Sequence, residues 1–298
     1  MEYCLLGKSD LNISRIGFGC MSLNPSDPDA ENILHKAMDA GINYFDTADM
    51  YHKGQNEVML GKAFRDKRKD LILATKVGNQ WRNDGSGWDW NPSKEYILTS
   101  IDRSLDRLQT DYIDLYQLHG GTMEDPIDDV IEAFEMLKSA GKIRFYGISS
   151  IRPNVIREYI KRSSIVSVMM QYSLLDRRPE EDMLPLLKEN HIGVLARGSV
   201  AKGLLISKPA EQYLNYSAEQ IIKAAATVNS VAGSLSNPLE TSVHFVLKNP
   251  AVSSAVIGIR TESQLKEALA IRSADFLGED QLETLRNALA ANKYTDHR

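Results

Sequence analysis

Short apolar runs alternate with longer stretches in which apolar residues recur at helical spacing along most of the chain. The short runs predict β-strands, and the stretches between them predict amphipathic helices. The predicted strands are Arg15–Gly19, Asn43–Asp46, Leu71–Lys76, Tyr112–His119, Phe145–Ser149, Ser167–Tyr172, Gly193–Ala196 and Ser254–Gly258. The predicted helices are Asp29–Ala40, Asn56–Arg65, Ser93–Leu108, Ile127–Ala140, Pro153–Arg162, Glu181–Asn190, Leu239–Asn249 and Glu262–Ala270. A hairpin over Tyr3–Leu6 and Leu11–Ser14 is expected before the first strand, and a final helix over Glu279–Ala291 after the last.

The ends of the predicted helices carry the residues expected there. Gly41 and Gly141 follow helices as C-terminal stops, and Ser93 precedes one as an N-cap. Strands that alternate with helices of this length predict right-handed βαβ units. Eight such units in fewer than 300 residues predict a (β/α)₈ TIM barrel, with an N-terminal β-hairpin and an extra C-terminal helix.

A doubly wound sheet is the alternative fold. It would be favoured by a glycine-rich G-x-G-x-x-G turn between a strand and a helix. The nearest candidate, Gly17-Phe18-Gly19, has no third glycine and no helix directly after it, so the barrel is preferred. No linker or shift in composition divides the chain, and residues 1–298 are therefore interpreted as a single domain.

Two connections are longer than a barrel needs, 79–92 after the third strand and 203–238 after the seventh. Long loops on the active face of a barrel commonly act as lids or as walls of the substrate pocket. We expect them to determine which substrate is accepted.

Composition and charge narrow the class of protein. The chain is 43% hydrophobic and 25% charged with a formal charge of −5, which gives no reason to expect nucleic acid or an anionic membrane as partner. No apolar run approaches the roughly 18 residues of a membrane span. The two cysteines make no disulfide framework, and the charges that flank the first apolar residues are unlike those of a signal peptide. We expect a cytoplasmic protein.

Four side chains at the ends of successive predicted strands carry complementary chemistry: Asp46, Tyr51, Lys76 and His119. A tyrosine phenol has a pKa of about 10, so proton donation at neutral pH requires its phenolate to be stabilised. A nearby ammonium provides that charge, and a carboxylate keeps the ammonium protonated and oriented. A histidine donates a hydrogen bond to a carbonyl oxygen. None of the four supplies a reductant, so a reduction would need a cofactor.

Each of these residues also has an ordinary structural interpretation. Asp46 before Thr47 is typical of a turn or a helix cap, and Tyr51 of an exposed loop position. Lys76 would merely end a strand, and His119 before two glycines would bond to the backbone of a turn. The combination of four complementary groups favours a site.

The chain resembles the aldo-keto reductase family. The matching motifs are GINYFDTADMYHKGQNEVMLGKAF (41–64), LILATKVG (71–78), RSLDRLQTDYIDLYQLHG (103–120), GKIRFYGISS (141–150), MMQYSLLDR (169–177), GVLARGSVAKGLL (193–205) and VIGIRTESQLKEAL (256–269). The resemblance implies that Tyr51 is the general acid, that Asp46 and Lys76 tune it, and that His119 orients the carbonyl. It also implies an extended nicotinamide dinucleotide, bound without a Rossmann fold, which transfers hydride directly to the substrate carbon.

The resemblance also implies a set of cofactor contacts. They lie at Gly19, Cys20 and Met21 for the ribose and nicotinamide, Ser149, Ser150 and Gln171 for the carboxamide, Arg197 beside the ring, Gly198, Ser199, Val200, Lys202 and Gly203 for the pyrophosphate, and Gly258, Arg260 and Gln264 for the adenosine end. An arginine at the start of a helix suits a 2′-phosphate, which favours NADPH/NADP⁺ over NADH. The alternative is that Arg260 only balances surface charge.

Three positions depart from the family pattern. Ser150 replaces an asparagine, Ala268 replaces an asparagine that holds adenine, and Arg197 replaces an aromatic residue that stacks on nicotinamide. A guanidinium stacks on a ring, yet it repels the cationic oxidised nicotinamide. Arg197 is therefore expected either to favour the reduced cofactor or to turn away into a salt bridge.

All three tryptophans fall in the first long loop, and Trp81, nearest the strand end, is the candidate substrate wall. Trp88 and Trp90 would serve equally well to pack the loop. Cys20 is interpreted as a buried structural thiol rather than a reactive one.

The activity that these residues and the resemblance favour is NADPH-dependent reduction of aldehydes or activated ketones. A cofactor-binding regulatory subunit is the alternative, and it would gain nothing from a tuned tyrosine. A phosphate-handling isomerase or lyase on the same barrel would need a lysine of lowered pKa, whereas Asp46 would raise the pKa of Lys76. No metal site is predicted, and neither the natural substrate nor the oligomeric state follows from the sequence.

Overall fold

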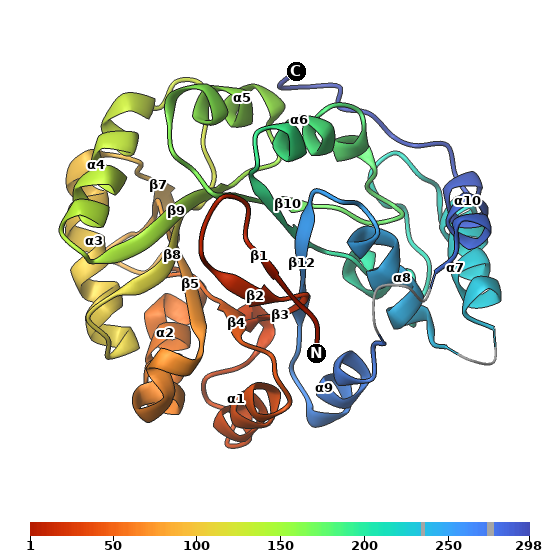
Figure 1. Ribbon diagram of the computed structural model, residues 1–298, viewed down its shortest axis with the longest axis horizontal. Coiled ribbons are helices and arrows are strands. Elements are labelled where there is room, and N and C mark those ends of the chain that lie inside the picture. Colours follow the sequence, from red (N-terminus) through yellow and green to blue (C-terminus); the bar gives the residue numbers. More distant parts are fainter. Residues whose placement is uncertain (234–235, 273–276) are drawn as a thin grey trace.

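The computed structural model describes residues 1–233, 236–272 and 277–298 (Figure 1). The strands are β1 (Tyr3–Leu5), β2 (Asn12–Ser14), β3 (Ile16–Gly19), β4 (Tyr44–Asp46), β5 (Ile72–Val77), β6 (Asn79–Trp81), β7 (Trp88–Trp90), β8 (Ile113–Leu118), β9 (Ile143–Ser149), β10 (Ser167–Gln171), β11 (Gly193–Arg197) and β12 (Val252–Gly258). The helices are α1 (Ala30–Asp39), α2 (Gln55–Phe64), α3 (Lys94–Leu108), α4 (Ile127–Ser139), α5 (Pro153–Arg162), α6 (Met183–Glu189), α7 (Ala218–Ala232), α8 (Pro238–Leu247), α9 (Glu262–Leu269) and α10 (Glu279–Asn287).

Eight strands close into a barrel in the order β10-β11-β12-β3-β4-β5-β8-β9. Every neighbouring pair in this ring is parallel, and helices surround the ring (Figure 1). The predicted (β/α)₈ barrel is confirmed. Because the strands are parallel, their carboxyl ends lie at one end of the barrel, where side chains from different strands can meet.

The N-terminal hairpin of β1 and β2 closes the opposite end of the barrel and lies over its centre in Figure 1. Its Leu6, Leu11 and Ile13 are fully buried and belong to the cluster that fills the barrel interior. Burying side chains of this size stabilises the fold by about 1.5–3 kcal/mol each. The hairpin therefore acts as a plug.

Aromatic side chains fill the layer between barrel and helices. Phe45 on β4 stacks on Phe18 of β3 with centroids 5.6 Å apart and packs against Phe64 of α2 at 4.6 Å. On the far side, Phe134 of α4 stacks on Tyr146 of β9 at 5.3 Å. These contacts hold β4 and β9 against the helices that surround the barrel.

The long segment 203–238 contains helix α7, which the sequence pattern did not predict. Ser217 caps this helix and forms a capping box with Gln220. Its buried face includes the small residues Ala224 and Ala232, so the apolar periodicity is weak. Residues 234 and 235 of the segment lie outside the described residues. The last helix, α10, packs against α7 and ends at Asn287, earlier than the sequence suggested.

The other long segment, 79–92, forms the antiparallel pair β6–β7. Trp90 of β7 lies over two glycines at the barrel mouth: a methyl group at Gly78 would come within 2.5 Å of its ring, and one at Gly120 within 3.3 Å. Its indole N–H donates to Asp125 at 2.9 Å. Trp90 therefore packs the hairpin onto the barrel.

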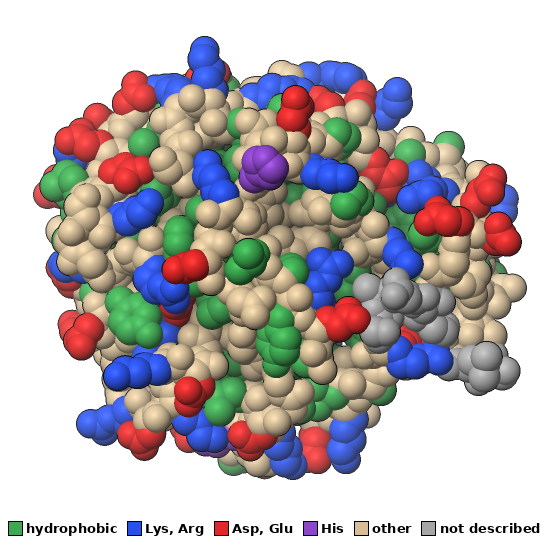
Figure 2. Space-filling model, in the orientation of Figure 1, with side chains coloured by type: hydrophobic (Ala, Val, Ile, Leu, Met, Phe, Trp, Pro, Cys, Tyr) green, Lys and Arg blue, Asp and Glu red, His purple; other side chains and the backbone are tan. Residues whose placement is uncertain are grey.

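The face of the molecule shown in Figure 2 carries acidic and basic side chains interspersed over most of its area. None of the helices within the described ranges has the length and apolar character needed to cross a lipid bilayer.

Candidate active site

Three neighbouring strands bring the four predicted catalytic residues to one end of the barrel. Asp46 is the last residue of β4, Lys76 lies near the end of β5, and His119 follows β8 directly. Tyr51 opens a short 3₁₀ segment after β4. Since β4, β5 and β8 are adjacent in the ring, these side chains converge.

Asp46 and Lys76 form a buried ion pair. The Lys76 ammonium lies 2.5 Å from Asp46 Oδ2 and donates to the Thr47 carbonyl at 2.7 Å. Gln117, which the sequence reasoning did not select, donates to Asp46 Oδ1 at 3.4 Å, and its own Oε1 is buried without a partner among the described residues. The carboxylate is therefore oriented from two sides.

The pKa directions follow from burial and from this pairing. Burial lowers the pKa of Lys76, but the charges and hydrogen bonds of Asp46 and Tyr51 outweigh it, so the net pKa is raised and the ammonium persists. Burial raises the pKa of Asp46, and the Lys76 charge opposes that effect. The attraction between the two opposite charges therefore keeps Lys76 protonated beside Asp46.

Tyr51 lies against both Lys76 and His119. The Lys76 ammonium is 5.2 Å from the centroid of the phenol ring, and the His119 ring meets it edge to face at 5.7 Å. Burial raises the pKa of Tyr51, while the Lys76 charge lowers it; burial prevails, so the phenol stays protonated at neutral pH. A proton donor thus lies beside a fixed positive charge.

A sharp turn holds Tyr51 in place. His52, Lys53 and Gly54 have successive φ values of 49°, 54° and 85°, a left-handed run that reverses the chain before α2. The φ of 85° favours glycine at position 54, where a side chain would also lie 2.9 Å from the flexible Arg107 side chain.

His119 is neutral near pH 7. Burial, followed by the charges of Lys76 and Arg197, lowers its pKa from 6.5 to about 3. Its Nδ1 is buried and has no partner within the described part of the chain. A neutral imidazole carries one N–H, so His119 can donate a single hydrogen bond to a bound molecule.

A buried asparagine that the sequence reasoning missed connects two of these loops. Asn56 accepts a hydrogen bond from Thr47 at 2.6 Å and donates to the carbonyls of Cys20 and Leu23 at 2.9 and 3.2 Å. It ties the end of β4 to the loop after β3. Its neighbours Gln55 and Glu57 are also polar, so the sequence pattern did not indicate that Asn56 is buried.

Glu57, which the sequence pattern also did not single out, bonds to the strand that carries Lys76. Glu57 on α2 is fully buried; it accepts from Thr75, the neighbour of Lys76, at 2.6 Å and pairs with Arg107 of α3 at 2.6 Å. The carboxylate thus fixes β5 between two helices.

The predicted cofactor residues after β3 differ in exposure. Met21 is 59% exposed, whereas Cys20 is fully buried and burial raises the pKa of its thiol well above the ordinary value. The structural interpretation of Cys20 is supported, since a protonated buried thiol is unreactive. Gly19, at the end of β3, lies close to Ile257 of β12 and leaves little room for a side chain.

Gln171 and Arg197 end the adjacent strands β10 and β11 and bond to each other. An Arg197 N–H donates to Gln171 Oε1 at 3.3 Å, and Gln171 Nε2 donates to the Tyr213 hydroxyl at 2.6 Å. Among the described residues, Arg197 pairs with this amide rather than with a carboxylate. Tyr213, from the loop after β11, was not selected from the sequence.

The two serines at the end of β9 lie in different surroundings. Ser149 is partly exposed at the strand end, while Ser150 is buried and its hydroxyl accepts the N–H of Arg152 at 3.2 Å. Ser150 thus begins the turn into α5.

The loop after β11 is tightly folded. Gly198 and Gly203 have φ values of 74° and 95°, and Ala201 and Lys202 between them are also left-handed at 48° and 59°. The N–H groups of Ala201 and Gly203 donate within the loop, to Gly198 and Val200. The pyrophosphate contacts expected at Gly198, Ser199, Val200, Lys202 and Gly203 stay a prediction.

Arg260 and Gln264 lie at the start of α9. Thr261 caps this helix by accepting from the Gln264 N–H, and Gln264 Oε1 accepts the Arg260 N–H at 2.9 Å. The Arg260 side chain is exposed. Gly258, at the end of β12, approaches Ser22, so a methyl group there would lie 3.0 Å from the Ser22 hydroxyl.

Trp81 lies beside the catalytic loop. Its indole N–H donates to the Met50 carbonyl at 3.1 Å, next to Tyr51, and the Lys53 ammonium lies 5.2 Å from its ring. Trp88, its partner across the hairpin, is 47% exposed.

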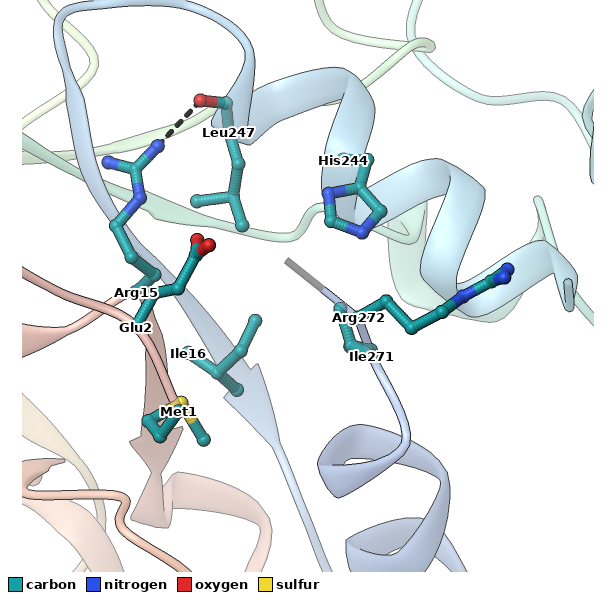
Figure 3. Close-up of a pocket in the computed structure, with 8 residues that line it drawn as sticks. All are labelled: Met1, Glu2, Arg15, Ile16, His244, Leu247, Ile271 and Arg272. Atoms are coloured by element: carbon teal, nitrogen blue, oxygen red, sulfur yellow. Dashed lines mark hydrogen bonds between the residues drawn. The ribbon is translucent and has the colours of Figure 1, made fainter. Parts of the chain in front are cut away.

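A separate pocket lies at the N-terminal end of the barrel (Figure 3). Met1, Arg15, His244 and Leu247 are among its lining residues, and Arg15 donates to the Leu247 carbonyl at 2.7 Å. None of the four catalytic candidates lines it. Within the described ranges, no cluster of three or more His, Cys, Asp or Glu side chains is arranged to hold a metal ion.

Comparison with known proteins places the chain in a family. The model of the aldo/keto reductase family matches residues 15–290. A relative from Bacillus subtilis (strain 168), the uncharacterized oxidoreductase YqkF, is 52% identical over 302 residues, which cover 98% of each chain.

Two solved structures share the whole fold. The holo form of the aldo-keto reductase AKR11C1 from Bacillus halodurans has a TM-score of 0.94 at 47% identity and is aligned over 100% of this chain and 99% of its own. The apo form of the same protein has a TM-score of 0.85 at 44% identity, with the same coverage. The chain therefore belongs to the aldo/keto reductase family and is an NAD(P)H-dependent oxidoreductase.

Proposed function

We propose that this protein reduces aldehydes or activated ketones to alcohols with NADPH, and that Tyr51 donates the proton. The observation that carries the proposal is the convergence of a protonated phenol, a buried Lys76–Asp46 ion pair and a neutral His119 at one end of the barrel. A reduced nicotinamide, when bound, supplies the hydride that none of these side chains can provide.

Each protein group has one task in this scheme. As negative charge develops on the carbonyl oxygen, Tyr51 transfers its hydroxyl proton to it, and the adjacent Lys76 ammonium stabilises the phenolate that remains. Asp46 holds the ammonium charged and in place. His119, neutral because of its lowered pKa, donates its single N–H to the same oxygen and orients the carbonyl.

The residues opposite this group fit a nicotinamide dinucleotide. The Ser199 hydroxyl is buried with no partner among the described residues, so a ligand oxygen nearby would satisfy it. The similarity to a holo structure, greater than to its apo form, supports a conformation suited to the cofactor.

Arg260 supports NADPH rather than NADH. Its exposed guanidinium precedes the capped start of α9 and forms no hydrogen bond or ion pair with the described residues. A 2′-phosphate would find there both a bidentate donor and a helix N-terminus. Trp81, bonded next to the catalytic loop, would form one wall of the substrate pocket.

The test is turnover and cofactor binding in the wild type and in Tyr51→Phe. With a panel of aldehydes, the loss of absorbance of the reduced cofactor should slow by at least about 10²–10⁴-fold in the variant, since a general acid is removed. Calorimetry should find NADPH affinity changed by no more than a few-fold.

Tyr3→Phe is the matched control, because it removes an exposed phenol at the opposite end of the barrel and should turn over normally. Full activity in Tyr51→Phe would refute the assignment. NADPH binding by the wild type without turnover on any aldehyde would instead favour a cofactor-binding regulatory subunit.

A further inference from the structure

A tyrosine from the long loop after β11 reaches one of the predicted cofactor contacts. Tyr213 is buried, and its hydroxyl accepts a hydrogen bond from Gln171 Nε2 at 2.6 Å. On its other side the Gln171 amide accepts from Arg197 at 3.3 Å. The amide is therefore held between a phenol and a guanidinium.

Arg197 determines which way the Gln171 amide faces, and Tyr213 holds the amide in that orientation. A guanidinium only donates hydrogen bonds, so the amide oxygen must be directed towards Arg197. Nε2 is then directed towards Tyr213, whose hydroxyl oxygen accepts. Without such partners the last torsion of a glutamine is broad, and oxygen and nitrogen exchange places at little cost. Tyr213 makes the shorter of the two contacts.

Tyr213 is itself fixed by the C-terminal segment. It pairs with Tyr216 through an isolated antiparallel bridge, and the Tyr216 hydroxyl donates to the Ala290 carbonyl at 2.7 Å. Asn292 adds a hydrogen bond to Asn215 at 3.3 Å. A loop anchored in this way places its phenol at a defined point beside β10.

We propose that Tyr213 is a positioning residue for the cofactor: it holds Gln171 with its amide oxygen towards the nicotinamide end of the site. Oxygen Oε1 has a second lone pair, which accepts a hydrogen bond from the carboxamide NH₂ of the dinucleotide. This inference depends on the proposed function, because it requires a nicotinamide cofactor at the ends of β10 and β11.

The experiment uses two cofactors that differ only at the group that Gln171 would contact. In the acetylpyridine analogue of NADP⁺, an acetyl group replaces the carboxamide, so the ring substituent keeps its carbonyl and has no N–H. Calorimetry should find Tyr213→Phe binding NADP⁺ roughly three- to tenfold more weakly than the wild type, the size of one hydrogen bond. Binding of the analogue should change by less than about twofold.

Tyr146→Phe is the matched control. It also removes a buried phenol with two hydrogen-bond partners, Glu135 and the Ser164 N–H, but on the helix side of β9. It should bind both dinucleotides as the wild type does. Because both variants lose a buried, hydrogen-bonded phenol, weaker NADP⁺ binding in Tyr213→Phe alone would come from the lost contact to Gln171 and not from a lower stability of the fold.

A second measurement tests the route through Gln171. In a Gln171→Ala background, adding Tyr213→Phe should change NADP⁺ affinity by less than about twofold, since the amide through which Tyr213 acts is gone. An equal weakening of both dinucleotides by Tyr213→Phe, or no weakening of either, would overturn the inference. Failure of the wild type to bind NADP⁺ at all would overturn the proposed function instead.

Discussion

The two sides of the barrel mouth are built differently. On the side of β4, β5 and β8, Asp46 and Lys76 are buried and bonded at 2.5 Å. On the side of β10 and β11, Arg197 is exposed, and Ser199 has a buried hydroxyl with no partner in the described ranges. Reacting groups need fixed positions and a low dielectric before the substrate arrives. A surface that admits a large dinucleotide must instead keep donors available for it.

The largest effect is expected from breaking the ion pair. Lys76→Met leaves the Asp46 carboxylate buried without its partner, which should lower the free energy of unfolding by about 3–5 kcal/mol. Turnover should also fall. Because Lys76 lowers the pKa of Tyr51, the pH limb that belongs to Tyr51 should move to higher pH. Urea denaturation and a pH–rate profile measure the two effects.

The double variant Lys76→Met with Asp46→Asn is the control for this prediction. It removes both charges, so it should recover much of the stability without recovering activity. If the single variant were as stable as the wild type, the side formed by β4, β5 and β8 would not depend on a preformed ion pair, and the contrast between the two sides would fail.

The next effect concerns stability in acid, and it is spread over several pH units. Burial lowers the pKa of His119 from 6.5 to about 3, so in that interval the unfolded chain binds a proton that the folded chain excludes. Its contribution makes the free energy of unfolding fall as pH decreases, by at most about 1.4 kcal/mol per pH unit. His119→Leu should therefore lose stability less steeply on acidification, as followed by urea denaturation at several pH values.

The exposed histidine His297 provides the comparison for that experiment. His297→Leu should follow the wild-type curve. Parallel curves for wild type and His119→Leu would show that His119 is not kept neutral by its surroundings.

On the side proposed to bind the cofactor, Arg260→Ala should change the preference between NADPH and NADH without affecting stability. The variant loses a charged hydrogen-bond donor to the 2′-phosphate. Its affinity for NADPH should therefore fall by roughly ten- to a hundredfold, and its affinity for NADH should stay nearly unchanged. Fluorescence titration with both cofactors measures this. Equal affinities of the variant and the wild type for NADPH would show that Arg260 only contributes surface charge.

The smallest expected change is at Arg197. A guanidinium repels the cationic oxidised nicotinamide, so Arg197→Tyr should raise the affinity for NADP⁺ relative to that for NADPH by roughly a few-fold. The lost contact to Gln171 affects both cofactors alike. Its charge reaches the site, since it lowers the pKa of His119. Identical changes for both cofactors would remove the idea that this residue favours the reduced form.

Local pattern was enough to predict the barrel and the convergence of Asp46, Lys76 and His119 at one end of it. Short apolar runs mark the strands, and glycines such as Gly41 and Gly141, which have positive φ, mark the ends of helices. Asp46, Lys76 and His119 follow from this, because parallel strands in a closed ring bring their carboxyl ends together. Helix α7 was missed because small residues weaken its apolar period.

The sequence by itself determined the element order, the barrel and the chemistry at the ends of β4, β5 and β8. Only the tertiary structure decided the partners of these groups. Asn56 bonds to Cys20, and Gln171 is held between Arg197 and Tyr213, residues that are distant in the chain. Periodicity reports which face of a segment is buried, whereas a hydrogen bond between side chains depends on distances of a few tenths of an ångström set by the packing of the whole barrel.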